Sequence, residues 1–138
     1  MAQQLSVFLE NAPGHLSRLT RFLGDNNINM HALFVADTGD YGVARILCDQ
    51  TARAVEVLRD AGFSVTVTEV VAVEVPDKPG GLADLLDDIA AADIDISYSY
   101  CFVDPATKNA CNVFRLKDPG AAQLIRDAGY RVLLDTDL

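Results

Sequence analysis

Two short stretches of the sequence carry residues that could hold a small charged ligand. Each contains a Pro-Gly pair, at 13–14 and at 79–80, with a polar residue two positions before the proline, Asn11 or Asp77. Proline restricts the backbone and glycine has no Cβ, so a ligand can approach the main chain closely. Where a helix begins at such a turn, its first N–H groups lack partners and carry partial positive charge. Each stretch is therefore a candidate site for a carboxylate group.

A second polar residue follows each turn, where the chain is predicted to re-enter a strand: Asn29 in "NINMH" and Asp95 in "DIDIS". A single Pro-Gly turn with a nearby Asn is also an ordinary start of a helix, and that interpretation needs no ligand. The repeated spacing favours binding. Because Asp77 and Asp95 would repel a ligand carboxylate, the first turn, with Asn11 and Asn29, is the better candidate site for an amino acid.

The two turns belong to an internal repeat. The Pro-Gly pairs are 66 residues apart (79 − 13), and "RDAGF" at 59–63 recurs as "RDAGY" at 126–130, an offset of 67 (126 − 59). One residue is therefore inserted between these matches, in the predicted turn regions 36–42 and 103–110. The offset of 66 also matches three aliphatic pairs: Leu16 with Leu82, Leu19 with Leu85, and Ile28 with Ile94. We predict two units, 1–70 and 71–138.

Each unit predicts the element order β-α-β-β-α-β. The first unit has an alternating strand at 5–9, a helix with Leu16, Leu19 and Leu23 inward, strands at 28–36 and 43–48, a helix from the N-cap Thr51 to Gly62, and a strand at 64–68. The second has a strand at 71–75, a helix with Leu82, Leu85, Leu86 and Ile89 inward, strands at 94–103 and 111–116, a helix from Asp118 and Pro119 to Gly129, and a strand at 131–134. This order is typical of the ferredoxin-like fold of the α+β class, with antiparallel sheets and helices on one face.

The join between the two units is predicted to be stiff. Residues 63–75 contain no Gly, Pro or Asn, so there is no signal for a flexible linker. The pattern predicts either two rigidly packed units or one long bent strand that serves both sheets.

Composition excludes several classes of partner. The formal charge is −9 and the pI is about 4.4, which argues against binding of nucleic acid and of anionic membrane surfaces. No stretch approaches the roughly 18 apolar residues of a membrane helix, and the first residues do not resemble a signal peptide. We expect a soluble, cytoplasmic protein.

The sequence offers little for catalysis. The only two histidines, His15 and His31, could come near each other, but without a carboxylate partner they would make a poor metal site. No nucleophile, phosphate-loop or zinc motif is present, so we predict a protein that is not an enzyme and has no metal or cofactor. The cysteines Cys48, Cys101 and Cys111 are expected to be reduced and partly buried, a Cys101–Cys111 bridge being the alternative.

The stretches "ENAPGHLSRLTRFLGDNNINMHAL" and "PDKPGGLADLLDDIAAADIDISYSYCF" resemble the ACT domain. The resemblance covers nearly the whole chain, as a tandem ACT protein. It implies a regulatory protein that binds an amino acid or a related small molecule and pairs through sheet edges into a homodimer. Such a protein regulates an enzyme or a transcription factor, and a partner enzyme is the expectation here. The alternative is a ligand-free ACT pairing module that docks onto a metabolic enzyme and regulates it.

The resemblance also implies where the ligand lies: between the first turn of one domain and the second strand of its neighbour. The residues that match these positions are Asn11, Ala12, Pro13, Gly14, His15 and Leu16 in the turn, and Asn29, Met30 and His31 on the second strand. Tyr98, on the second strand of the second unit, is the candidate for an opposite wall. Some serine-binding ACT domains have a histidine where this chain has Leu9, so serine is not predicted.

Overall fold

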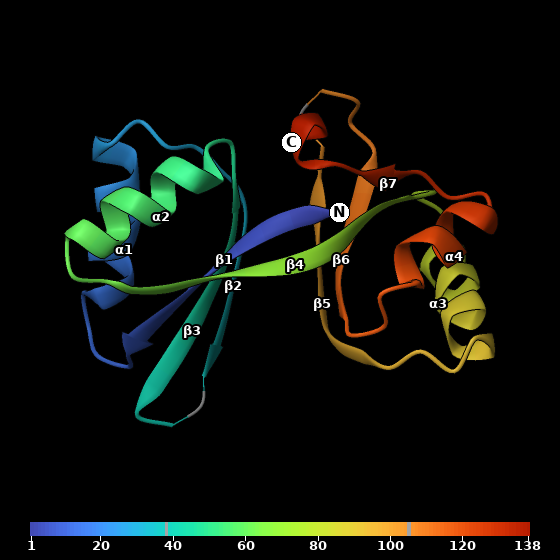
Figure 1. The fold of residues 1–138 in the computed structure, drawn as a ribbon, viewed down its shortest axis with the longest axis horizontal. Helices are drawn as coiled ribbons and strands as arrows, with labels where there is room; N and C mark the ends of the chain where they lie inside the picture. Colours follow the sequence, from blue (N-terminus) through green and yellow to red (C-terminus); the bar gives the residue numbers. More distant parts are fainter. Residues whose placement is uncertain (38, 105) are drawn as a thin grey trace. The chain divides into compact units, whose positions relative to one another are not determined.

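The computed structural model describes residues 1–37, 39–104 and 106–138 (Figure 1). Thr38 and Pro105, which belong to the two predicted turn regions, lie outside the described residues. The chain divides into two compact units. Gln3–Thr68 form one, called here the N-terminal unit, and Glu69–Leu138 together with Met1–Ala2 form the other, called the C-terminal unit.

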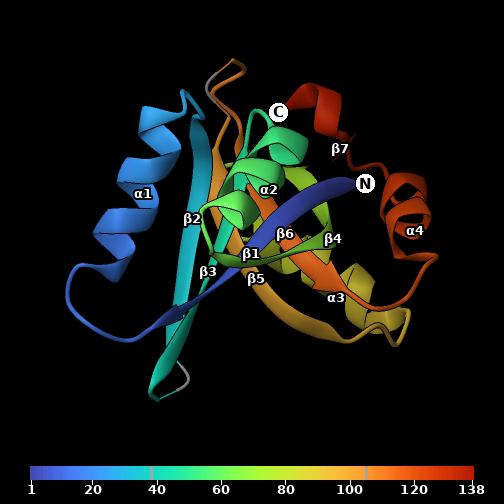
Figure 2. The ribbon, with the colours of Figure 1, turned by 60° about the vertical axis from the view of Figure 1, so that its left-hand side comes forward.

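The N-terminal unit places two helices on one face of an antiparallel sheet (Figure 2). Its elements are β1 (Ala2–Glu10), α1 (His15–Asp25), β2 (Met30–Asp37), β3 (Tyr41–Cys48), α2 (Thr51–Asp60) and the first part of β4 (Ser64–Val75). The strand order is β2-β3-β1-β4, so β2 lies at the edge. Both β1 and β2 pair antiparallel with β3, and they therefore run parallel to each other on its two sides.

The C-terminal unit repeats this arrangement. Its elements are the rest of β4, α3 (Gly81–Ala91), β5 (Ile96–Val103), β6 (Ala110–Leu116), α4 (Ala121–Asp127), β7 (Val132–Leu133) and the 3-10 helix η1 (Asp135–Asp137). The order is β5-β6-β4-β7, with antiparallel pairing at each step, and β5 lies at the edge. The prediction of two ferredoxin-like βαββαβ units in the α+β class is therefore confirmed.

One uninterrupted strand, β4, contributes to both units. It runs from Ser64 to Val75 without a break, as expected for a stretch rich in valine and threonine with no glycine or proline. Val65 packs in the core of the N-terminal unit, whereas Val71 and Val73 pack in the core of the C-terminal unit. The join is therefore one continuous strand, as one of the two interpretations of the sequence predicts.

The two helices that follow the Pro-Gly turns pack on the sheets as predicted, except at their first turns. Leu19 and Leu85 are fully buried. By contrast, Leu16 and Leu82 are 38% and 40% exposed, so the prediction that both point inward was wrong. They lie in the first turn of each helix, beside an exposed loop, where the helix has not yet reached the core.

For α2 and α4, the predicted C-terminal glycines agree with the structure, whereas the predicted N-terminal caps do not. Gly62 and Gly129 follow α2 and α4 with φ of 90° and 97°, the left-handed backbone that glycine adopts without strain. Thr51 is the first residue of α2 and not its N-cap, and no side chain caps this helix. Asp118 Oδ1 accepts a hydrogen bond from the N–H of Gly120 at 2.8 Å, which closes a turn before the helix. As a result α4 begins at Ala121 and not at Pro119.

The three cysteines carry free thiols. Cys48 and Cys111 are buried, as expected, but Cys101 is exposed on the edge strand β5. Burial raises the pKa of the Cys111 thiol to about 11, and the carboxylates of Asp104 and Glu74 add to this effect. At neutral pH that thiol is protonated, which disfavours disulfide exchange.

Candidate functional site

The first turn is tied to the β2–β3 hairpin through one residue. The backbone N–H of Asn11 donates to the carbonyl of Asp40 at 2.7 Å. The side-chain amide of Asn11 donates to Asp37 Oδ1 at 3.2 Å and to the carbonyl of Gly39 at 3.1 Å. These bonds use the amide nitrogen and leave Asn11 Oδ1 as an exposed acceptor with no partner among the described residues. That oxygen can accept a hydrogen bond from an ammonium group.

The backbone of the same turn presents unpaired donors. Gly14 adopts φ 88° and precedes α1, and no side chain caps this helix. Within the part of the chain that the structure describes, the N–H groups of Gly14, Leu16 and Ser17 donate to no protein atom. All three residues are exposed. They form a donor set at the positive end of the helix dipole, which is suited to a carboxylate.

The residues predicted on the second strand lie just before it or at its start. Asn29 precedes β2; its N–H donates to Asp49 Oδ1 at 3.1 Å, and its carbonyl accepts the N–H of Asp49 at 3.1 Å. Its exposed side chain has no partner among the described residues. Met30 packs against the core. His31 is half-buried, and its Nε2 is a buried atom without a hydrogen-bond partner in the described part of the chain.

The structure does not bring the two predicted halves of the site together within one unit. Glu10, at the end of β1, pairs with Tyr41 at the start of β3, whereas Met30, at the start of β2, pairs with Cys48 at its end. Seven residues of strand separate these two pairs, which corresponds to roughly 20 Å. The first turn and Asn29 therefore lie at opposite ends of the sheet, and so do the two histidines.

Tyr98 lies on β5 in the C-terminal unit. It is half-buried and pairs with Arg115 of β6, next to a bulge between Ile96 and Tyr98. Tyr100, which pairs with Val113, is likewise half-buried and lies on the same face of the strand. The two tyrosines therefore form one aromatic row on β5, as the alternation in the sequence predicts.

The second turn has the same backbone but a different setting. Gly80 adopts φ 82°, and Lys78 N–H donates to the Pro76 carbonyl at 2.9 Å, just as Ala12 N–H donates to the carbonyl of Glu10 at 2.9 Å. A cavity of about 430 Å³ lies beside this turn. Its charged and polar lining residues are Glu74, Asp77, Lys108, Asn109, Tyr130 and Arg131.

Sequence reasoning did not select most of these cavity residues. The internal repeat does contain a signal for two of them. Glu74 corresponds to Phe8 at the offset of 66, and Arg131 corresponds to Ser64 at the offset of 67, so both positions change in charge between the two copies. A charged residue that is present in only one copy of the internal repeat can indicate a function that only that copy has.

The hairpin that carries Lys108 is organised by a buried carboxylate. Asp104 is 5% exposed, and its Oδ1 accepts the N–H of Ala106 at 2.8 Å and that of Thr107 at 3.4 Å. The hydrogen bond from Ala106 lowers the pKa of Asp104, and it outweighs the opposing effect of burial. The ionised carboxylate thereby stabilises the folded hairpin.

We expect Asp104→Ala to lower the free energy of unfolding at pH 7 by about 1–3 kcal/mol, because both backbone N–H groups lose a charged acceptor. The folded pKa lies below the unfolded value of about 3.9. This contribution is therefore present above about pH 4 and is lost as pH falls through the folded pKa. Urea unfolding at pH 7 and at about pH 3 measures both effects.

The matched control is Asp104→Asn, which keeps an acceptor oxygen but does not titrate. At pH 7, Asp104→Asn is expected to lower the free energy of unfolding less than Asp104→Ala does. Between pH 7 and about pH 3, its free energy of unfolding should fall less than that of the wild type. If Asp104→Asn and the wild type lose the same stability between the two pH values, the assigned role of the carboxylate is wrong.

In ranges 1–37, 39–104 and 106–138, no group of three or more His, Cys, Asp or Glu side chains is arranged to hold a metal ion. None of the described helices is long and apolar enough to cross a membrane.

Comparison with known proteins identifies the class to which this fold and these turns belong. The family model described as "ACT domain pair" matches residues 1–130. The chain belongs to this ACT domain pair family. No curated protein matches the chain.

Two solved structures illustrate the relationship. Protein BT0572 from Bacteroides thetaiotaomicron is 34% identical, with a TM-score of 0.89, over 99% of this chain and 94% of that one. The ligand-free regulatory subunit of aspartate kinase from Thermus thermophilus is 13% identical, with a TM-score of 0.66, over 91% of this chain and 89% of that one. The second likeness is one of fold.

Proposed function

We propose that this protein is a non-catalytic regulatory sensor that binds an amino acid at the first turn, 11–16. The ligand carboxylate accepts hydrogen bonds from the backbone N–H groups of Gly14, Leu16 and Ser17. The ligand ammonium donates a hydrogen bond to Asn11 Oδ1. The observation that carries the proposal is this exposed donor set beside an exposed acceptor, held in place by the bonds of Asn11 to the hairpin. The proposed site includes all six turn residues, Asn11, Ala12, Pro13, Gly14, His15 and Leu16.

The second half of the proposed site comes from a neighbouring ACT unit. Asn29 lies at the opposite end of its own sheet from the first turn, so Asn29, Met30 and His31 can complete only the site of a neighbour. The edge strand β2 supports pairing of two copies. Its Leu33 and Val35 are 41% and 47% exposed, and an edge strand offers unpaired backbone groups to another chain. We infer a homodimer, with Tyr98 of β5 as a further wall residue.

The regulatory output is proposed to reach a separate partner enzyme. The fold is shared with the regulatory subunit of aspartate kinase from Thermus thermophilus. His15 and His31 lie at opposite ends of the sheet, so these two residues do not act together as an acid–base pair within the N-terminal unit. A soluble, cytoplasmic protein suits this role. Nucleic acid is a poor partner for a chain with a formal charge of −9.

Calorimetric titration of each of the twenty amino acids tests the proposed ligand class. Asn29→Ala is the cleanest variant, because its side chain has no partner among the described residues and its removal should leave the fold unchanged. We expect at least about tenfold weaker binding, as for loss of one charged hydrogen bond. Asn11→Ala should have a similar effect, and the control Asn27→Gly, at an exposed residue with φ 58°, should have none.

Thermal unfolding separates this proposal from the ligand-free alternative. A ligand at a hundredfold excess over Kd stabilises the folded state by about 2.7 kcal/mol. If no amino acid raises Tm, the protein is better explained as a pairing module that docks onto an enzyme. Sedimentation of the wild type tests the homodimer directly.

A further inference from the structure

The loop between α1 and β2, residues 26–29, is fastened to the segment that leads into α2. Asn29 and Asp49 bond to each other twice. The N–H of Asn29 donates to Asp49 Oδ1 at 3.1 Å, and the N–H of Asp49 donates to the carbonyl of Asn29 at 3.1 Å. One residue that directly follows β3 therefore engages both backbone polar groups of Asn29.

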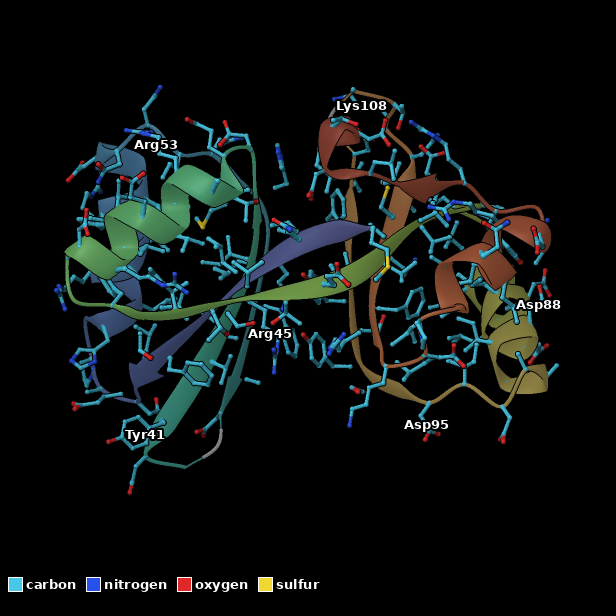
Figure 3. The ribbon with its side chains drawn as sticks, viewed as in Figure 1. Tyr41, Arg45, Arg53, Asp88, Asp95 and Lys108 are labelled. Carbon is cyan, nitrogen blue, oxygen red and sulfur yellow. The ribbon has the colours of Figure 1, made fainter. Side chains whose placement is uncertain are left out.

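Two longer side chains hold the earlier part of the same loop. Gln50 Nε2 donates to the carbonyl of Asn27 at 3.0 Å. The guanidinium of Arg53 donates to the carbonyl of Asn26, and Figure 3 shows Arg53 beside the end of α1. We call these bonds, together with those of Asp49, the loop clamp.

The loop clamp uses only the backbone of the loop. The side chain of Asn29 is exposed and has no partner among the described residues. The clamp thus fixes where Asn29 lies but leaves its side-chain amide available to a ligand.

The rest of the loop does not fix Asn29 by itself. Ile28 is buried, and its N–H donates to the carbonyl of Leu23 at 2.9 Å, so the core of the N-terminal unit anchors this residue. Asn27 adopts φ 58°, a left-handed backbone that is uncommon for residues other than glycine. Asn29 is exposed and follows both of them, and its backbone is held from outside the loop by Asp49.

The C-terminal unit does not repeat the loop clamp. Its β6 ends at Leu116 and is followed directly by Lys117, where β3 is followed by the carboxylate of Asp49. Among the described residues, no hydrogen bond joins 92–95 to 117–120. The clamp is therefore a feature of the unit that carries Asn29, and the C-terminal unit folds without one.

A fixed backbone at Asn29 strengthens binding through the entropy term. An exposed residue that is mobile in the free protein must be ordered when a ligand contacts it, and this ordering weakens the affinity. The ordering of one residue's backbone corresponds to a factor of about five to thirty in the dissociation constant. Since Asp49 already orders Asn29, the ligand meets a residue that is in place.

We propose that Asp49 is a positioning residue for amino-acid binding: it fixes the backbone of Asn29 and thereby directs the Asn29 side chain to the ligand at the first turn of a neighbouring unit. Asp49 itself does not contact the ligand. This inference rests on the proposed function, and it adds to the site a residue that lies outside both the first turn and β2.

Calorimetric titration of the full chain with each of the twenty amino acids tests this role in three variants. Asp49→Ala removes the acceptor and is expected to bind the amino acid that the wild type binds about five- to thirtyfold more weakly. Asp49→Asn keeps the Oδ1 acceptor and should restore most of the affinity. Asp49→Glu keeps the charge but displaces the carboxylate by one methylene group, so it should also bind more weakly, and it serves if Asp49→Ala does not fold.

The matched control is Asp118→Ala in the C-terminal unit. Asp118 Oδ1 also accepts a backbone N–H just before a helix, that of Gly120 at 2.8 Å. Asp118→Ala should therefore lower the free energy of unfolding, as Asp49→Ala does, but leave the affinity for the amino acid unchanged. Equal weakening of binding by both substitutions would mean that affinity merely follows stability, and it would overturn the positioning role.

Hydrogen exchange in the ligand-free protein tests the geometry without reference to binding. In Asp49→Ala the N–H of Asn29 should exchange roughly two- to tenfold faster than in the wild type, the factor that corresponds to one net hydrogen bond. The N–H of Ile28, whose acceptor is the carbonyl of Leu23, should be unaffected. Unchanged exchange at Asn29, followed by NMR, would show that Asp49 does not hold this residue.

The failure of this inference and that of the proposed function are distinguishable. If the wild type binds an amino acid and Asp49→Ala binds it equally well, the positioning role is wrong and the proposed function stands. If the wild type binds none of the twenty amino acids, the proposed function is wrong and the positioning role falls with it.

Discussion

Replacing Phe114 by alanine is expected to lower the free energy of unfolding by about 3–5 kcal/mol. Phe114 lies on β6 and is 0% exposed, in the core of the C-terminal unit. It pairs with Val71 of β4 and shares this core with Leu85 of α3 and Ile125 of α4. Truncation leaves a cavity where strand and helices meet, and a close-packed interior refills such a space only in part.

The matched control is Phe8→Ala, on β1. Phe8 is 46% exposed, so its removal deletes less buried surface and leaves no enclosed cavity. We expect a loss of about 1 kcal/mol or less. Urea unfolding of both variants measures the difference, and equal losses for Phe114→Ala and Phe8→Ala would contradict the assignment of Phe114 to the core.

Replacing Gly81 by alanine is expected to cost roughly 2–4 kcal/mol, because the added Cβ has no room. Gly81 is the first residue of α3 and is buried. A Cβ at this position would overlap the carbonyl oxygen of Pro76 and lie 3.3 Å from the carbonyl carbon. Both atoms are backbone, so no side-chain rotation can relieve the overlap and the second turn must shift.

Gly24→Ala is the control for Gly81→Ala. Gly24 lies within α1, its φ is not positive, and a Cβ there would have no heavy atom within 4 Å. Alanine favours the helix over glycine by up to about 1 kcal/mol, so this substitution should raise stability. Glycine-to-alanine substitution is thus predicted to lower the free energy of unfolding at Gly81 and to raise it at Gly24. Destabilisation of similar size at both positions, measured by thermal or urea unfolding, would refute the argument from the Pro76 contact.

Much of the fold could be predicted from local patterns. The alternation of β1, the leucine spacing of α1 and the glycines after α2 and α4 each act over a few residues, and the structure agrees with them. Several errors concern the first turns of helices. Leu16 and Leu82 follow the periodicity of a buried face, but periodicity does not report where the sheet beneath the helix ends.

The candidate site was less predictable than the fold. Residue types predict the turn 11–16 as a binding site, which stays a prediction. The N–H groups of this turn that have no partner among the described residues agree with the helix-start argument. The side chain of Asn11 forms hydrogen bonds with Asp37 and Gly39, which follow it by 26 and 28 positions in the sequence. A local sequence pattern does not span that separation. Lys108 has no matching signal in the sequence, because its relation to Asp77 arises only when β4 and β6 pair.

The sequence by itself determined that this protein is two copies of one βαββαβ unit, with a Pro-Gly turn in each and Asn or Asp around it. These features depend on periodicity and backbone preference, which are local. Only the tertiary structure decided that β1 and β2 run parallel on the two sides of β3, so that Asn11 and Asn29 lie at opposite ends of one sheet. It also decided that Asp77 and Lys108 line the same cavity. Both outcomes follow from strand pairing between distant residues, and that pairing depends on the burial of the whole core.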